Sequence, residues 1–139
     1  MSVSFRWLAH SAFAFSIDGN SVYVDPFITN NPLSPIKVNE ADADVILVSH
    51  GHGDHVGDAV AIAQRTQAPT ISNVEIAGWL RHQGAPNAIG INTGGTINLD
   101  FMSVKLTPAF HSSSLPDGSY GGMPNGMIIV TNGGLKIYY

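Results

Sequence analysis

The chain has 139 residues, of which 44% are hydrophobic and 12% are charged, and its formal net charge is −4. This composition is typical of one folded domain with a hydrophobic core, and it excludes a disordered tail or a basic protein that coats nucleic acid. The absence of cysteine excludes disulfides and thiolate metal ligands. No apolar run approaches the roughly 20 residues that span a bilayer. The first residues lack the pattern of a signal peptide, so we expect a cytoplasmic location.

The N-terminal segment predicts three short strands, over Ser4–Leu8, Ala12–Ile17 and Ser21–Val24. The sequence Asp18-Gly19-Asn20 between the last two strands is typical of a hairpin turn. A loop rich in asparagine and proline follows over Thr29–Pro35.

The middle of the chain predicts strands that alternate with helices. Val45–Val48 is a continuous apolar run, as in a strand buried on both faces. Apolar residues at helical spacing indicate helices over Asp58–Gln67 and Val74–Gln83, the second stopped by Gly84. A short buried strand, Thr70–Ser72, lies between them.

The C-terminal third predicts strands again. Thr96–Leu99 and Met102–Pro108 read as strands, Ser112–Asn125 as a loop, and Met127–Val130 with Leu135–Tyr139 as a hairpin around an Asn-Gly-Gly turn. The pattern therefore predicts one mixed α/β domain over residues 1–139, with no linker that divides it.

The segment HGHGDH, residues 50–55, stands directly after the buried strand and before a helix, where α/β proteins place their functional sites. His50 and His52 are two residues apart and can point the same way from an extended segment. Asp54 and His55 follow and can face a second position. A ligand set without sulfur suits zinc, manganese or iron. The plain structural alternative is a polar loop whose histidines cap a helix or bond to carbonyl groups.

The segment matches the His-x-His-x-Asp-His signature of the metallo-β-lactamase superfamily. Among its branches, the chain resembles the uncharacterised metal-dependent hydrolases related to ascorbate-6-phosphate lactonase. The matching stretches are WLAHSAF (7–13), VYVDPF (22–27), ILVSHGHGDHVGDAV (46–60), PAFHSSSLPDGSYGG (108–122) and the terminal KIYY. The resemblance covers nearly the whole chain.

The resemblance implies a role for each ligand. His50, His52 and His111 would hold a first metal ion, and Asp54 and His55 would contribute to a second, so that one or two zinc ions are expected, with manganese or iron as alternatives. His111 stands where a predicted strand ends, and three protein ligands plus water are usual for catalytic zinc.

Several other residues are candidates, each with a plainer alternative. Asp25 either forms a turn or orients a metal-bound histidine through its carboxylate. His10 lies in a matching stretch and could contact the substrate or a ligand. Ser112–Ser114 and Gly121-Gly122 could line the pocket, although loop composition explains them equally well. His82 reads as a surface residue on a helix.

Members of this family continue beyond the strand that matches KIYY, with an aspartate that bridges the two metals and a last histidine. In this chain no aspartate follows Asp117 and no histidine follows His111. The resemblance therefore implies an α/β fold, the N-terminal half of an αββα sandwich, with a mixed sheet and helices on one face. The chain could be one piece of a split protein, a truncated product, or a half-domain that associates with itself. We expect that it needs a second polypeptide or a homo-oligomer to complete the fold, because an apolar edge strand would otherwise be open.

The expected function is metal-dependent hydrolysis of a small-molecule ester, lactone or phosphodiester by metal-activated hydroxide. With a single metal, Asp54 would act as the general base. The alternative is a metal-binding half-domain that is inactive alone and assembles with another chain or with itself. A nuclease is less favoured, because the chain is acidic and lacks basic patches, and neither nucleic acid nor a membrane is expected as a partner.

Overall fold

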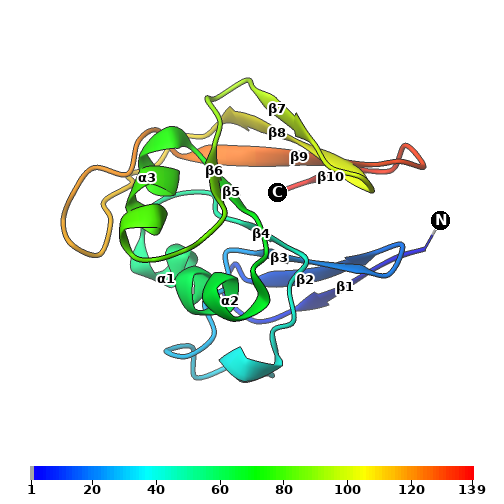
Figure 1. Ribbon diagram of the computed structural model, residues 1–139, viewed down its shortest axis with the longest axis horizontal. Coiled ribbons are helices and arrows are strands. Elements are labelled where there is room, and N and C mark those ends of the chain that lie inside the picture. Colours follow the sequence, from blue (N-terminus) through cyan, green and yellow to red (C-terminus); the bar gives the residue numbers. More distant parts are fainter. Residues whose placement is uncertain (1) are drawn as a thin grey trace.

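The first three strands form an antiparallel meander, as the sequence predicts. In the computed structural model, which describes residues 2–139, they are β1 (Val3–Trp7), β2 (Phe13–Ile17) and β3 (Asn20–Val24) (Figure 1). Asp18 and Gly19 connect β2 to β3 with φ angles of 49° and 88°. Positive φ at both central residues is what a tight two-residue hairpin turn requires, and aspartate followed by glycine tolerates it.

Three parallel strands extend this meander into one six-stranded sheet. β4 (Val45–Leu47) pairs with β3, β5 (Thr70–Ser72) pairs with β4, and β6 (Ala88–Gly90) pairs with β5, so the strand order is β1-β2-β3-β4-β5-β6. Every residue of β4 and β5 is buried. Burial on both faces explains why β4 has no polar position, since parallel strands are covered on both sides.

Helices cover one face of this sheet. They are α1 (Gly53–Val56), α2 (Ala59–Thr66) and α3 (Val74–His82), and a 3-10 turn, η1 (Val38–Glu40), precedes β4. Ile46 of β4 packs in the same hydrophobic cluster as Ile62 of α2 and Leu80 of α3. Asn73 begins α3 by accepting a hydrogen bond from the Ile76 amide at 2.8 Å.

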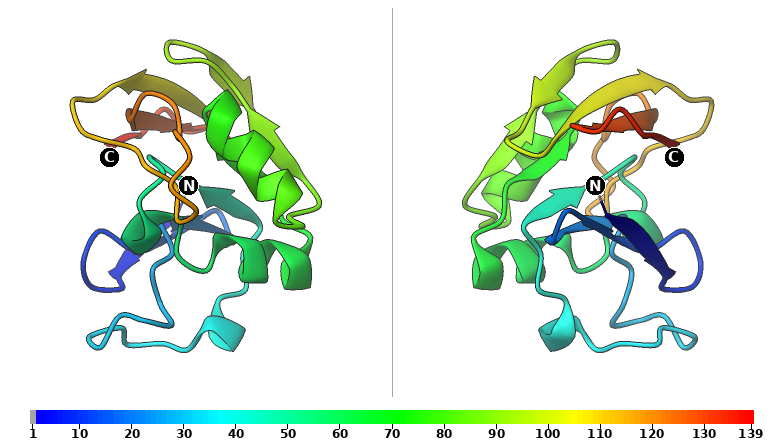
Figure 2. Two further views of the ribbon diagram at one scale, coloured as in Figure 1. Left: turned by 90° about the vertical axis from the view of Figure 1, so that its left-hand side faces the viewer. Right: turned by 90° about the vertical axis from the view of Figure 1, so that its right-hand side faces the viewer.

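A second, antiparallel sheet covers the other face. It contains β7 (Thr96–Asn98), β8 (Met102–Pro108), β9 (Asn125–Thr131) and β10 (Lys136–Tyr138), in the order β10-β9-β8-β7. Val45 and Leu47 face this sheet and pack with Leu106 and Ile129. The alternation along β4 therefore separates a helix-facing core from a sheet-facing core, and Figure 2 shows the two sheets as separate layers.

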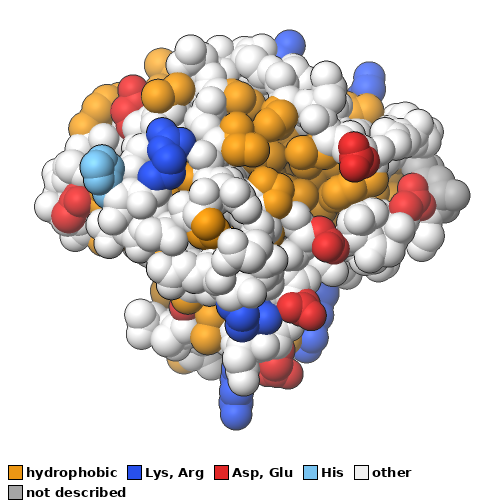
Figure 3. Space-filling view, viewed as in Figure 1, with side chains coloured by type: hydrophobic (Ala, Val, Ile, Leu, Met, Phe, Trp, Pro, Cys, Tyr) orange, Lys and Arg blue, Asp and Glu red, His pale blue; other side chains and the backbone are white. Residues whose placement is uncertain are grey.

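The observed architecture confirms the predicted α/β class, with a mixed sheet and helices on one face. The sequence did not predict β6, which has only three residues, or the single turn of α1. Other boundaries differ from the prediction by one or two residues. None of the helices within residues 2–139 has both the length and the apolar character to cross a membrane. Figure 3 shows hydrophobic side chains on the surface between the two sheets.

Candidate metal centre

The histidine segment, residues 50–55, connects β4 to α1. Hydrogen bonds join this connection to the loop between β8 and β9. The Gly51 amide donates to Ser113 Oγ at 2.9 Å, and the Asn125 amide donates to the Ser49 carbonyl at 3.0 Å. A Cβ atom on Gly51 would lie 3.2 Å from Leu115 and from the Ser113 carbonyl. Gly51 therefore allows the two loops to approach closely, and this approach brings His111 toward the β4 end of the sheet.

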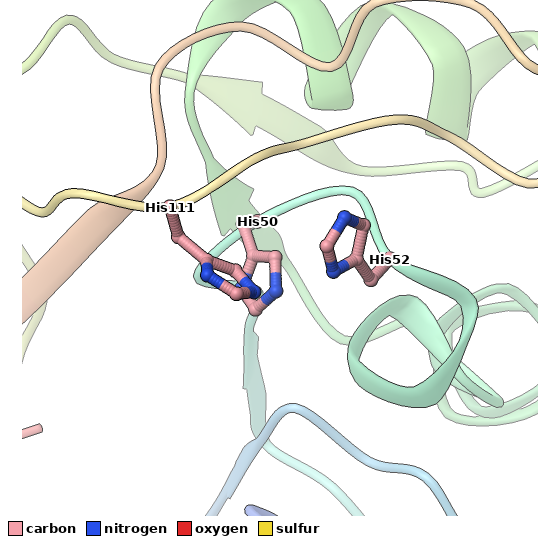
Figure 4. A group of neighbouring side chains, drawn as sticks. All are labelled: His50, His52 and His111. Carbon is pink, nitrogen blue, oxygen red and sulfur yellow. The ribbon is translucent and has the colours of Figure 1, made fainter.

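His50, His52 and His111 converge on one point, as Figure 4 shows. Their ring centroids are 4.7 Å (His50–His52), 5.0 Å (His50–His111) and 5.0 Å (His52–His111) apart. Three imidazoles around one tetrahedral zinc ion, with Zn–N distances of about 2.0–2.1 Å, have centroids about 5 Å apart. The spacing of the three rings therefore fits a single ion at their centre.

The surroundings of His50 favour a metal ligand. Its Nδ1 lies 2.9 Å from Ser49 Oγ, whereas its buried Nε2 has no hydrogen-bond partner. Burial and the neighbouring His55 lower the pKa of His50 to about 4, so the ring is neutral at pH 7. Buried polar atoms without a partner are rare in folded proteins, and a metal ion would satisfy this one.

The other two members of the group are more accessible. His52 is half-buried, and its Nε2 lies 3.1 Å from Ser112 Oγ. His111 is exposed and follows β8 by three residues, close to where the sequence placed it. The three histidines offer only imidazole nitrogens as ligands for an ion at their centre, and this donor type suits zinc and iron.

Asp25 is fully buried directly after β3 and accepts hydrogen bonds from three residues, Ser49, His55 and Tyr139. Its Oδ1 accepts from the Ser49 amide at 2.7 Å. Its Oδ2 accepts from Ser49 Oγ, from Tyr139 Oη at 2.8 Å and from His55 Nδ1 at 2.7 Å. The Ser49 hydroxyl, which donates to Asp25, accepts from Nδ1 of His50. These bonds keep the proton on Nδ1 of both histidines and leave each Nε2 free to bind a metal.

Sequence reasoning missed Ser49 and Tyr139. Ser49 precedes the first histidine and could have been noticed, but Tyr139 is 114 residues from Asp25 and only the fold brings them together. Burial and the Asp25 carboxylate raise the pKa of Tyr139, so its hydroxyl remains a hydrogen-bond donor.

A second group of ligand types adjoins the first. His10, Asp54 and His55 each place one potential ligand atom within 4.8 Å of the others. His10 Nε2 lies 3.2 Å from Asp54 Oδ2, and the rings of His10 and His55 have centroids 5.2 Å apart. The structure thus brings the β1–β2 loop, which carries His10, to the histidine segment.

The remaining candidates divide into two sets. Ser112 and Ser113 contact the histidine segment directly, and Ser113 Oγ also donates to the Gly121 carbonyl at 3.2 Å. His82 is exposed on α3 and belongs to none of the ligand groups among residues 2–139. A cavity of about 380 Å³ is lined by His50, His55 and His111 together with residues of β9 and the C-terminal segment.

The chain is similar to proteins described as metal-dependent hydrolases. Residues 4–139 match the family described as the beta-lactamase superfamily domain. A UPF0173 metal-dependent hydrolase of Methylacidiphilum infernorum is 45% identical over 134 residues, which cover 96% of this chain and 59% of that protein. A homologous hydrolase of Thermus thermophilus is 43% identical, over 99% of this chain and 60% of that protein.

A solved structure agrees with these matches. Igni18, described as a metallo hydrolase from Ignicoccus hospitalis, is 38% identical with a TM-score of 0.80, over 94% of this chain and 57% of that one. The chain thus spans less than two thirds of the length of these relatives. Because the family match covers residues 4–139, almost the whole chain, the chain belongs to the metallo-β-lactamase-type family described as the beta-lactamase superfamily domain.

Proposed function

We propose that the protein takes part in metal-dependent hydrolysis of a small-molecule ester, lactone or phosphodiester. The observation that carries this proposal is the buried, unpartnered Nε2 of His50, which lies in a group of three converging imidazoles. A neutral His50 with its proton on Nδ1 is prepared to bind a cation without first losing a proton. We propose zinc as the metal, with manganese or iron as alternatives.

The residues around this group support hydrolysis of a small substrate. A divalent metal, when bound, lowers the pKa of a ligating water to about 7 and polarises the oxygen of the bond under attack. The adjoining cavity of about 380 Å³ is of a size that accepts small molecules. Asp54, whose side chain is 47% exposed, is the carboxylate that we propose as the general base if only the three-histidine site is filled.

The test replaces His50 with alanine. We expect His50→Ala to lose the metal of the three-histidine group. Hydrolysis should then fall by more than roughly 10–100-fold, which is the loss typical when a residue that is hydrogen-bonded to a metal ligand is replaced. The probes are a p-nitrophenyl ester, a γ-lactone and bis-p-nitrophenyl phosphate, and metal content is measured by elemental analysis.

The matched control is His82→Ala, which removes an exposed histidine on α3 and should change neither quantity. If metal content and hydrolysis both survived in His50→Ala, the assignment of the site would be wrong. Circular dichroism of both variants establishes that any loss is not caused by unfolding.

The competing proposal is a metal-binding half-domain that is inactive alone and gains activity by assembly with a second polypeptide or another copy of itself. The observation that favours this alternative is the apolar groove of about 540 Å³ that is lined by Phe5, Phe13 and Ile137 and offers a surface for assembly. A chain that binds metal at the three histidines but hydrolyses none of the probes would support it. The cytoplasmic location stays a prediction.

A further inference from the structure

Asn73, between β5 and α3, uses both ends of its side-chain amide, although a helix cap needs only the oxygen. The residue is 5% exposed, and its Oδ1 accepts from the Ile76 amide at 2.8 Å. Its Nδ2 donates to the Gly121 carbonyl at 2.7 Å and to the Met123 carbonyl at 3.0 Å. Capping requires an acceptor alone. The two donated bonds therefore have a separate effect, which is to hold the loop that follows His111 beside α3 (Figure 1).

We propose that Asn73 is a positioning residue of the metal centre, which fixes His111 against the other two histidines through this loop. The inference rests on the metal-dependent function proposed above. Asn73 follows β5, and the histidine segment follows the parallel neighbour β4, so both segments begin at the same edge of the sheet. The Ser72 hydroxyl donates to the Val48 carbonyl at 2.7 Å and joins the two strand ends.

A short series of hydrogen bonds leads from Asn73 to the histidine segment. The Gly121 amide donates to the Ser113 carbonyl at 2.7 Å. Ser113 is buried, and its Oγ donates to the Gly121 carbonyl at 3.2 Å and accepts from the Gly51 amide at 2.9 Å. Ser113 stands two residues after His111, and Gly51 belongs to the histidine segment. The series therefore sets how His111 faces that segment.

Gly121 and Gly122 allow the loop to come this close. A Cβ atom on Gly121 would lie 2.7 Å from the Ser113 carbonyl oxygen. Gly122 has a φ of 75°, and a Cβ atom there would lie 2.7 Å from Nδ2 of Asn73. Side chains at either position would push the loop away from Asn73 and Ser113. The glycine pair therefore has a structural reason beyond ordinary loop composition.

The tip of the same loop also contacts α3, but this contact does not replace the one at Asn73. Trp79 Nε1 donates to Oδ2 of the exposed Asp117 at 2.7 Å. An exposed hydrogen bond is readily exchanged for bonds to water, whereas a buried carbonyl that loses its donor is costly. Without the Asn73 amide, the buried Gly121 carbonyl would lose the nearer of its two donors.

The test compares Asn73→Ser with Asn87→Ser in the 139-residue chain. Serine keeps an acceptor that caps α3, but its single O–H cannot hold both loop carbonyls. Asn87 is the matched control, because its exposed side chain also donates to a distant carbonyl, that of Gln67, at 2.7 Å. Co²⁺ is added stepwise to the metal-free protein, and visible absorption gives the dissociation constant. The cobalt of the three-histidine group is the ion that His111→Asn loses.

We expect Asn73→Ser to bind this cobalt about tenfold more weakly or worse, a loss like that of residues that support metal ligands. Asn87→Ser should bind it as tightly as the unsubstituted chain. Amide hydrogen exchange of the metal-free protein gives a second readout that needs no metal. Exchange over residues 112–122 should be faster in Asn73→Ser, whereas exchange in α3 should be unchanged because its cap is kept.

Unchanged cobalt affinity in Asn73→Ser would overturn the inference, and the proposed function would still stand. Weaker binding with faster exchange throughout the chain would also overturn it, since general destabilisation would then explain the loss. If Asn73→Ser does not fold, Asn73→Asp is judged by the same two measurements, because aspartate keeps the shape and the cap but has no donor. An unsubstituted chain that bound no cobalt would overturn the proposed function and the inference together.

Discussion

Asp25 links the two groups of histidines through hydrogen bonds from both. It contacts His55 directly and His50 through the Ser49 hydroxyl, and it is fully buried. Its φ of 43° turns the chain after β3 so that the carboxylate points at the end of β4. Asp25 therefore turns the chain after β3 and is hydrogen-bonded to His55 directly and to His50 through Ser49, whereas its role in orienting metal ligands stays a prediction.

Replacing Asp25 with asparagine should weaken metal binding by about 10–100-fold, the range found when a hydrogen-bonding partner of a ligand is lost. Asparagine keeps the shape and tolerates positive φ, but it has no charge and presents an NH₂ group to residues that are themselves donors. Competition with a chromogenic chelator measures the dissociation constant. Asp18→Asn is the matched control, since Asp18 also has positive φ, 49°, in the β2–β3 turn. Equal affinity in the two variants would show that Asp25 does not prepare the ligands.

The sequence indicated the candidate ligands more readily than the residues that are hydrogen-bonded to them. His50, His52, Asp54 and His55 lie within six positions, so their spacing alone indicates a common site. The assignment of these residues as ligands stays a prediction. The contacts of Asp25 with Ser49 and Tyr139 depend on pairing between distant strands, and no local pattern encodes them.

At the scale of elements, the connection from β4 through α1 to α2 determines where the histidine segment lies. Gly57 ends α1 with φ 47° and ψ −123°, and a Cβ atom there would lie 2.5 Å from the Pro26 carbonyl oxygen. The Asp58 amide then donates to that same carbonyl at 2.9 Å. The end of α1 is therefore packed against the segment that directly follows Asp25.

Gly53, the first residue of α1, and Gly57, which follows its last residue, provide a matched test of this packing. Gly57→Ala should destabilise the protein by about 1–3 kcal/mol or more, because the backbone conformation disfavours any side chain and the added methyl group clashes with backbone atoms. Gly53→Ala should change the stability by no more than about 1 kcal/mol and in the stabilising direction, since alanine is the better helix former. A Cβ atom at Gly53 meets nothing within 4 Å. Urea unfolding measures both, and equal stabilities would contradict the close approach to Pro26.

The same elements show which strands a sequence can reveal. β4 was predicted because Val45–Val48 are four consecutive apolar residues, a run that indicates a strand buried on both faces. β6, Ala88–Gly90, contains alanine and glycine, which are depleted in strands, so its composition does not indicate a strand. Gly90 is there because a Cβ atom would lie 2.8 Å from Cα of Val74, at the start of α3. That requirement arises from tertiary packing and leaves no signal in the sequence nearby.

At the scale of the whole molecule, an apolar groove remains between the two sheets. It has a volume of about 540 Å³ and is lined by residues of β1, β2 and the C-terminal strand, including Phe5, Phe13, Phe15 and Ile137. Phe5 is 69% exposed although it packs against the rings of Phe13 and Phe15. β1 and β10 are also edge strands of their sheets, so unpaired backbone groups border this groove.

The isolated chain should therefore self-associate through this groove, because an apolar surface bordered by open strand edges favours contact with another copy. Sedimentation at increasing concentration should give a mass above the 14.7 kDa of one chain. Phe5→Lys should lower that mass by placing a charge in the groove. The matched control is Phe110→Lys, because Phe110 is fully exposed and does not line the groove. A monodisperse monomer with a cooperative melt would show that the groove needs no cover, and the expectation of a homo-oligomer would then be wrong.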